Sequence, residues 1–167
     1  MTLATHSIVG LGLSSAFSLA PLPAFGLSLF SHYFLDMIPH WDYTPPFLIK
    51  DKENKFNHRL QTNPRLFYLS LLMCGADLLL GAVIGWLIFY SWSNLTPIVF
   101  ISSIAASVLP DFLQGLYIKF PHVRMLIVIQ NIHNFFHSRF EISNSILGIV
   151  YQILLVGIFT SIIFIIK

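Results

Sequence analysis

The chain is 167 residues long, which fits one domain. Hydrophobic residues make up 56% of it and charged residues 10%, and the mean hydropathy is +0.77, so an ordinary soluble globular domain is excluded and an integral membrane protein is predicted. The formal net charge of +2 arises from dispersed residues rather than from a basic stripe, which excludes a nucleic-acid-binding protein.

Two short apolar segments come first, at residues 7–20 and 24–38, and Pro21 and Pro23 separate them. At about 1.5 Å per residue each is about 21–23 Å long, too short for an upright crossing of a hydrocarbon core of about 30 Å. They predict a helical hairpin that enters and leaves on one face, or two short helices shielded by neighbours. No basic residue precedes the first segment, so we expect a mature first helix rather than a cleaved signal peptide.

Three longer apolar segments follow at residues 66–92, 97–118 and 143–166. Each is long enough to cross a bilayer as a helix, and Pro110 predicts a kink near the end of the second. The remaining apolar piece, 123–136, contains polar residues. We therefore expect it at the membrane interface or packed within the bundle rather than crossing.

Together these segments predict an all-α fold in one membrane-embedded domain over residues 1–167. The expected architecture is a multi-pass helical bundle with a short N-terminal hairpin and three longer helices. Basic residues gather in the loop at 39–65, namely Lys50, Lys52, Lys55, Arg59 and Arg65. The positive-inside rule places this loop in the cytoplasm, and two further crossings return the basic residues around 119–139 to the same side. We therefore expect a cell (inner) membrane protein whose active face is cytoplasmic.

The first cluster of ionisable residues is the stretch HYFLDMIPHWD at 32–42. His32 and Asp36 are four positions apart, so they lie on one face of the second predicted helix and can bind one ion. Pro39 ends this helix and lets the following loop fold back over the same point. Imidazole nitrogen and carboxylate oxygen suit zinc, manganese or iron. The alternative is a histidine and an aspartate that only hydrogen-bond to each other at a membrane boundary.

Two further histidines, His133 and His137, are also four positions apart, in the stretch HNFFHS. This spacing is a known helical metal pair, although it is also common by chance. His6 lies in the stretch THS just before the first predicted helix, where a lone histidine would be a cap or a solvated side chain. Alongside the other clusters, all three histidines are candidate ligands.

Asp111 directly follows Pro110 in the stretch LPDFLQG. A carboxylate beside a broken helix at membrane depth predicts a functional site. The alternative is an aspartate whose hydrogen bonds are satisfied by the hydroxyl groups of Ser102, Ser103 or Ser107.

These motifs together resemble a known family. The stretches THS (5–7), HYFLDMIPHWD (32–42), HR (58–59), LPD (109–111) and HNFFHS (133–138) look like those of the predicted membrane-bound metal-dependent hydrolases, small multi-pass proteins of bacteria and archaea. Separately, His32-x-x-x-Asp36 followed by Pro-His is similar to the ligand element of zinc-dependent phospholipase C and the related single-strand nucleases. These are helical proteins with multinuclear zinc sites that cut phosphoesters. The resemblance implies hydrolysis at a metal centre.

The first functional hypothesis is therefore a metal-dependent hydrolase that acts at the cytoplasmic leaflet on a phosphoester or other ester of a lipid-like substrate. Its candidate ligands would hold one or two divalent ions, zinc first and manganese or iron as alternatives, and are His6, His32, Asp36, Asp111, His133 and His137. Asp42 or Asp77 would accept a proton from the attacking water. Whether His40, His58 and His122 join the site stays open, as does the oligomeric state.

Two other classes of function stay open on the sequence alone. A small transporter or ion-relay protein would use Asp77 and Asp111 as intramembrane sites, since a kinked helix beside a buried carboxylate is also a feature of transport proteins. A structural or assembly subunit would tolerate alanine at every histidine and aspartate of the clusters.

Overall fold

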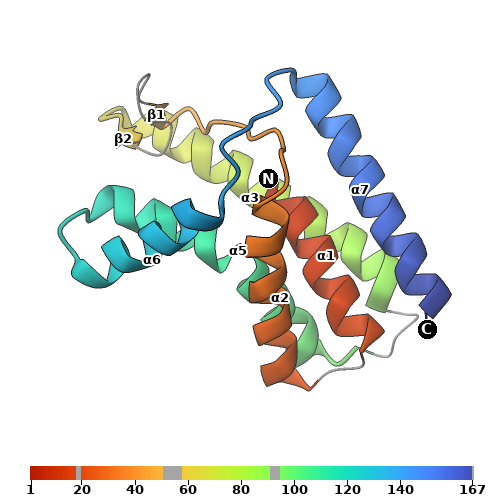
Figure 1. Ribbon diagram of the computed structural model, residues 1–167. Coiled ribbons are helices and arrows are strands. Elements are labelled where there is room, and N and C mark those ends of the chain that lie inside the picture. The colour runs from red at the N-terminus through yellow and green to blue at the C-terminus, as the bar shows by residue number, and fades with distance from the viewer. Residues whose placement is uncertain (18–19, 51–57, 91–94, 167) are drawn as a thin grey trace.

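The computed structural model describes residues 1–17, 20–50, 58–90 and 95–166, and most of them are helical (Figure 1). The elements follow the chain as α1 (Leu3–Ala16), α2 (Pro21–Asp36), β1 (Leu48–Lys50), β2 (His58–Leu60), α3 (Pro64–Gly85), the π-helix η1 (Trp86–Tyr90), α5 (Pro97–Lys119), α6 (Arg124–Phe136) and α7 (Ser145–Ile166). The prediction of an all-α fold is confirmed.

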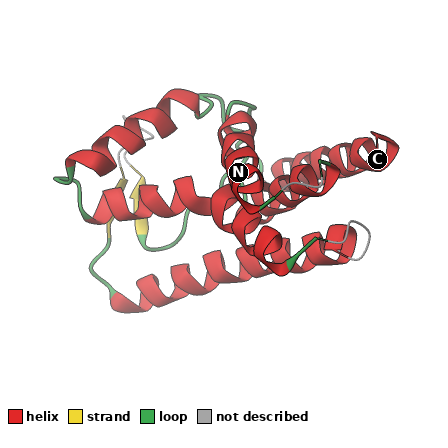
Figure 2. Cartoon of the chain, turned by 90° about the horizontal axis from the view of Figure 1, so that it is seen from below, coloured by secondary structure: helices red, strands yellow, loops and turns green. Residues whose placement is uncertain are grey.

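A small two-stranded ribbon interrupts the expected loop at 39–65. β1 pairs with β2 in an antiparallel register that sets Leu48 opposite Leu60. The ribbon lies at the end of the molecule away from the C-terminus (Figure 2). Two of the basic residues used to orient this loop, Lys52 and Lys55, lie outside the described residues.

The two short helices both begin earlier than the sequence predicted. α1 begins at Leu3 because the side chain of Thr2 accepts a hydrogen bond from the backbone N–H of Thr5 and caps the helix. His6 therefore lies inside α1, and the expectation that it precedes the helix was wrong. α2 begins at Pro21, because a proline in the first turn of a helix has no N–H that the helix needs.

Three helices are long and apolar enough to cross a membrane: α3 continued by η1, α5 and α7. They match the three long predicted segments, except that the first one was expected to reach residue 92, which lies outside the described residues. Much of their apolar surface is exposed: Leu72 is 69% exposed, Leu87 72% and Ile153 64%. Exposed apolar surface of this extent is stable against lipid acyl chains rather than water, which supports membrane association.

An apolar core closes one end of the bundle. It brings together Leu11 near the end of α1, Ala24 in α2, Phe89 in η1, Val99 in α5 and Ile163 near the end of α7. In Figure 1 the two short helices run side by side from this end toward the middle of α3 and α5. The start of α1 and the end of α2 therefore lie together, partway along the long helices.

Small residues allow α1 to approach its neighbours closely. A Cβ atom added to Gly81 of α3 would lie 2.5 Å from the Cα atom of Ala4, so no larger residue fits there without movement. On the other side, the hydroxyl groups of Ser103 in α5 and Ser14 in α1 are hydrogen-bonded at 2.7 Å. Small residues and hydroxyl bridges of this kind are typical of helix packing in membrane proteins. They bury α1, including His6.

Polar side chains hold the start of α1 in place. Asp77 of α3 accepts hydrogen bonds from the backbone N–H groups of Leu3 and Ala4, at 2.7 and 3.3 Å. Gln152 of α7 accepts from the backbone N–H of Thr2 at 3.0 Å and donates to the carbonyl oxygen of Trp41 at 2.8 Å. These bonds join the start of α1 to α3 and α7, and α7 to the loop after α2.

Candidate metal centre

The centre is built around Asp36, the last residue of α2. Its carboxylate is buried, and four histidines have their Nε2 atoms within 4 Å of one of its two oxygens. Those histidines are His6, His32, His40 and His133. Because α2 presents His32 one turn before Asp36, the pair predicted to share one helix face is confirmed, with 3.1 Å between Nε2 and Oδ2.

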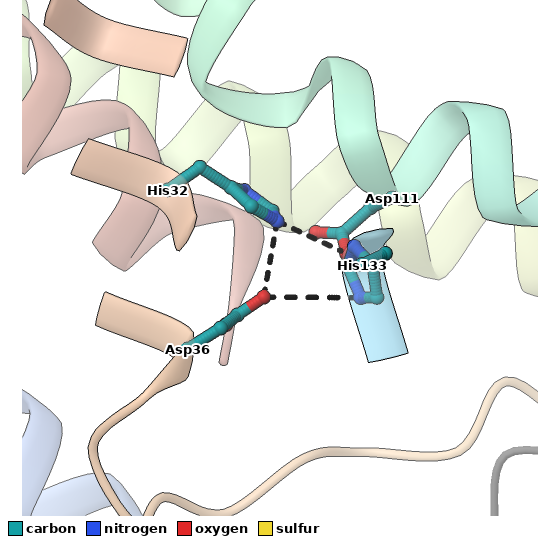
Figure 3. Close-up of side chains that lie close together, drawn as sticks. All are labelled: His32, Asp36, Asp111 and His133. Carbon is teal, nitrogen blue, oxygen red and sulfur yellow. Dashed lines mark ion pairs between the residues drawn. The ribbon is translucent and has the colours of Figure 1, made fainter. Parts of the chain in front are cut away.

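Four of the predicted ligands form a first group (Figure 3): His32 and Asp36 from α2, Asp111 from α5 and His133 from α6. Their ligand atoms all lie within 4.8 Å of one another. The Nε2 atom of His32 is 3.8 Å from Oδ1 of Asp111, and the Nε2 atom of His133 is 3.8 Å from Oδ2 of Asp36. Three helices therefore contribute two imidazoles and two carboxylates to one point.

The hydrogen bond at Nδ1 of His32 determines whether Nε2, the other ring nitrogen, can bind a cation. Its Nδ1 atom is 2.7 Å from the carbonyl oxygen of Ser107, which can only accept, so Nδ1 carries the proton. In the neutral ring, Nε2 then presents a lone pair to the carboxylates of Asp36 and Asp111. A lone pair that faces two carboxylates in a buried site is unfavourable unless a cation lies between them.

A second group lies on the other side of Asp36 and consists of Asp36, His40 and His137. The Nε2 atom of His40 is 3.8 Å from Oδ1 of Asp36. The Nε2 atoms of His40 and His137 are 3.1 and 3.4 Å from Oδ2 of Asp42. The amino group of Met1 also contacts Asp42, and it lies 3.6 Å from Oδ1 of Asp36.

Backbone pairing brings this second group together. The N–H of Ser138 donates to the carbonyl oxygen of Asp36 at 2.7 Å, and the N–H of Ile142 donates to that of His40 at 3.0 Å. The chain after α6 therefore runs beside the chain after α2. As a result His40 and His137 lie next to each other, with ring centroids 4.9 Å apart.

Burial and neighbouring charges set the protonation of the groups outside the candidate spans. Burial lowers the pKa of His133 to about 4 although Asp36 acts in the opposite direction, so this imidazole is neutral near pH 7. Burial also lowers the pKa of His137, but the hydrogen bond to Asp42 and the nearby carboxylates outweigh it and raise the pKa above its usual range. For Asp42, burial raises the pKa, and the amino group of Met1 and the bond from His137 more than offset this and hold it well below its usual range.

The residues present fit a cation by the chemistry of their donors. Two buried acceptor atoms of the groups have no hydrogen-bond partner, namely Nε2 of His32 and Oδ1 of Asp36. Buried polar groups in proteins are almost always satisfied, and a divalent ion would satisfy acceptors of this kind. The His/Asp groups can therefore hold a metal ion, with nitrogen and oxygen ligands only.

The remaining predicted residues fall into three different places. His6 stacks on His32 with ring centroids 4.0 Å apart and lies beside Asp36, but it belongs to neither group. His58 lies on β2 and His122 is exposed in the turn before α6, and neither is part of a group in the described chain. Asp77 caps α1, so this geometry gives no support to its predicted role as proton acceptor.

Two sequence interpretations were wrong in detail. His133 and His137 were expected to form one helical pair, but α6 ends at Phe136 and His137 has an extended backbone, so the two belong to different groups. Asp111 was given an alternative in which serine hydroxyls satisfy it. Those hydroxyls instead donate to backbone carbonyl oxygens: Ser102 and Ser103 to Val99, and Ser107 to Ile104.

The sequence also left one participant undecided. His40 is 1% exposed, its Nδ1 atom is 2.6 Å from the carbonyl oxygen of Ile38, and its Nε2 atom faces Asp36 and Asp42. The available signal was Pro39, which turns the chain immediately after the helix. Comparisons with protein-family models, with curated proteins and with solved structures give no match to this chain, so its function is inferred from the geometry of the centre.

Proposed function

We propose that the protein is a multi-pass membrane-bound hydrolase that uses a divalent metal ion to cleave a phosphoester or other ester of a lipid-like substrate at the cytoplasmic leaflet. The observation on which the proposal depends is the group formed by His32, Asp36, Asp111 and His133, whose donor atoms converge in a buried site from three helices. Zinc is the first candidate, with manganese or iron as alternatives. A divalent ion bound there would supply acidification of a water molecule to a nucleophile usable near neutral pH.

The chain's own residues would orient the metal ligands and accept a proton. The Ser107 carbonyl oxygen fixes the His32 ring, so that its Nε2 atom points to the ion position. Asp42 is 20% exposed, and it is a carboxylate beside the centre that belongs to neither metal group. We therefore retain Asp42 as the candidate proton acceptor.

The surroundings of the centre support a lipid-like substrate. α6 places His133 inward on the metal group, whereas its outer side forms an apolar hollow of about 330 Å³ lined by Val128, Asn131, Ile132, Phe135 and Phe136. Phe136 contacts Tyr33, with ring centroids 5.4 Å apart, and Tyr33 contacts both His32 and His133. An acyl chain in the hollow would lie one aromatic layer from the ligands.

The alternative of a transporter gains no support from these contacts. It needed Asp77 and Asp111 as relay sites, but Asp77 caps α1 while Asp111 belongs to the metal group.

The test is the metal content of the full chain purified in detergent, measured by elemental analysis, followed by incubation with phosphatidylglycerol vesicles and mass spectrometry of the products. We expect at least one transition-metal ion per chain, and its loss in His32→Ala and Asp111→Asn. His122→Ala, which changes an exposed histidine outside both groups, is the matched control and should keep the metal. A wild-type chain without stoichiometric metal would rule the proposal out.

A further inference from the structure

The two oxygens of the Asp36 carboxylate face different histidines. Oδ2 lies 3.1 Å from Nε2 of His32 and 3.8 Å from Nε2 of His133. Oδ1 lies 3.2 Å from Nε2 of His6 and 3.8 Å from Nε2 of His40. A carboxylate in this position can bind one cation through each oxygen.

The side of Asp36 toward His40 has the same construction as the first group. The Nδ1 atoms of His40 and His137 lie 2.6 and 3.1 Å from the carbonyl oxygens of Ile38 and Ser138, so both rings carry their proton on Nδ1 when neutral. Both Nε2 lone pairs then face carboxylate oxygens rather than donors. A ring N–H bound to a backbone carbonyl is the usual arrangement for a histidine that ligates a metal through its other nitrogen.

The carboxylates on this side already attract a cationic group. Asp36 and Asp42 bring two carboxylates to this side, and Asp111 adds a third carboxylate in the first group. The amino group of Met1 lies against Asp42 and Asp36 on the side of the second group. A cation is therefore accommodated next to His40 and His137.

We propose a second divalent transition-metal site formed by Asp36, His40 and His137, with Asp36 bridging it to the ion held by His32, Asp111 and His133. The inference rests on the proposed function and narrows it. Two ions that share a carboxylate lie about 3.5–4 Å apart, the separation at which both the attacking and the leaving oxygen of a phosphoester are stabilised. The second site thus favours a lipid phosphoester over a carboxylic ester as the substrate.

Elemental analysis of zinc in the purified full chain tests the number of ions directly. We expect two zinc ions in the wild type, one in His40→Ala and in His137→Ala, and none in Asp36→Ala. His122→Ala should keep both ions. If the wild type holds one ion and His40→Ala and His137→Ala keep it, the bridged site is refuted while the proposed hydrolase stands, with the Met1 amino group as the second cation. If the wild type holds none, the proposed function fails as well.

Loading the wild-type chain with Mn²⁺ gives a readout of the bridged pair that needs no variant. Two manganese ions that share a carboxylate give the electron paramagnetic resonance signal of an exchange-coupled pair, whereas a single isolated Mn²⁺ ion gives a six-line signal. We expect the coupled signal in the wild type and the six-line signal in His137→Gln. A six-line signal from a wild-type chain saturated with Mn²⁺ would overturn the bridging role of Asp36.

Discussion

Three histidines of the centre are held in the same way, by a backbone carbonyl oxygen that accepts from Nδ1. His32 uses the carbonyl of Ser107, His40 that of Ile38, and His137 that of Ser138. The protein thus sets the orientation and tautomer of each ring before any ion arrives. Support of this kind for metal ligands is typically worth about 10–100-fold in metal affinity.

The pH dependence of the stability of EDTA-treated protein should reflect the titration of His137. Its pKa is raised in the folded state, so its contribution to stability is fully present below the unfolded value of about 6.5 and is lost as the pH rises through the folded value. We expect the melting temperature of EDTA-treated protein to fall as the pH rises above about 6.5, and the fall to be smaller in His137→Asn. With Zn²⁺ the dependence should reverse, because a ligand histidine must be deprotonated. An unchanged slope in His137→Asn, with His122→Asn as the control, would contradict the assignment.

Variants of Asp77 distinguish a structural role of this residue from a catalytic one. Replacing it with alanine removes the acceptor for the first backbone N–H groups of α1 and should cost about 1–2 kcal/mol of stability. Asp77→Asn keeps an oxygen that can accept from Leu3 and Ala4 and should cost less. Both variants should retain the metal, since Asp77 is in neither metal group. Thermal unfolding in detergent and elemental analysis measure the two effects. If Asp77→Asn keeps the stability of the wild type but loses hydrolysis, the predicted role as proton acceptor is restored.

Among the elements, α6 has the polarity of its two sides reversed relative to a helix on a water-soluble protein. Its inward side carries Gln130 and His133, which are buried, and its outward side carries apolar residues that are exposed, namely Met125, Val128, Ile132 and Phe135. These four recur at helical spacing, so they form one stripe. Exposed basic residues flank this stripe: Arg124 is the first residue of α6, and Arg139 lies three residues beyond its end. An apolar stripe between basic ends is typical of a helix that lies in the membrane interface.

Spin labelling tests the position of α6. In a Cys74→Ser background, a nitroxide at Phe135→Cys should be accessible to oxygen, which partitions into lipid, and protected from a water-soluble nickel reagent. Phe135 is 82% exposed, so the label should not disturb the packing. A label at Arg139→Cys, three residues beyond the end of α6, is the control and should show the opposite accessibility. Equal exposure of both labels to the nickel reagent would show that the stripe faces water.

At the scale of the whole molecule, the centre exists because the short helices stop partway along the long ones. Their apolar ends join the core around Phe89 and Ile163, and their polar ends meet Asp77 on α3 and Asp111 on α5. The close approach of α1 to α3 at Gly81 determines where the start of α1 lies. His6 and the contact between Thr2 and Gln152 depend on the same approach.

A Gly81→Ala variant should therefore weaken metal binding although Gly81 belongs to neither metal group. The new methyl group would stand 2.5 Å from the Cα atom of Ala4, and overpacking of this kind usually costs about 1–3 kcal/mol. We expect a lower melting temperature and weaker metal binding, because α1 must move away from α3. Gly75→Ala on the same helix meets no atom within 4 Å and should leave both unchanged. Equal behaviour of the two variants would show that the close approach is not needed.

The sequence predicted the features that depend on interactions within one helix and misplaced those that depend on residues beyond its ends. The long apolar helices and the pairing of His32 with Asp36 were predictable, because hydropathy and the helical repeat act within one element. The start of α1 was misplaced, because its cap is a single threonine upstream of the apolar stretch. His133 and His137 were wrongly paired, because helical spacing is informative only as far as the helix continues.

By itself the sequence determined that the chain is helical and apolar, and that its histidines and aspartates lie near helix ends. Only the tertiary structure decided which of them meet. Packing of α2, α5 and α6 joins His32, Asp111 and His133, and backbone bonds between the segments after α2 and α6 join His40 to His137. The physical reason is that these contacts depend on how closely helix backbones approach and on which carbonyl groups are free to accept, and residue spacing along the chain contains neither.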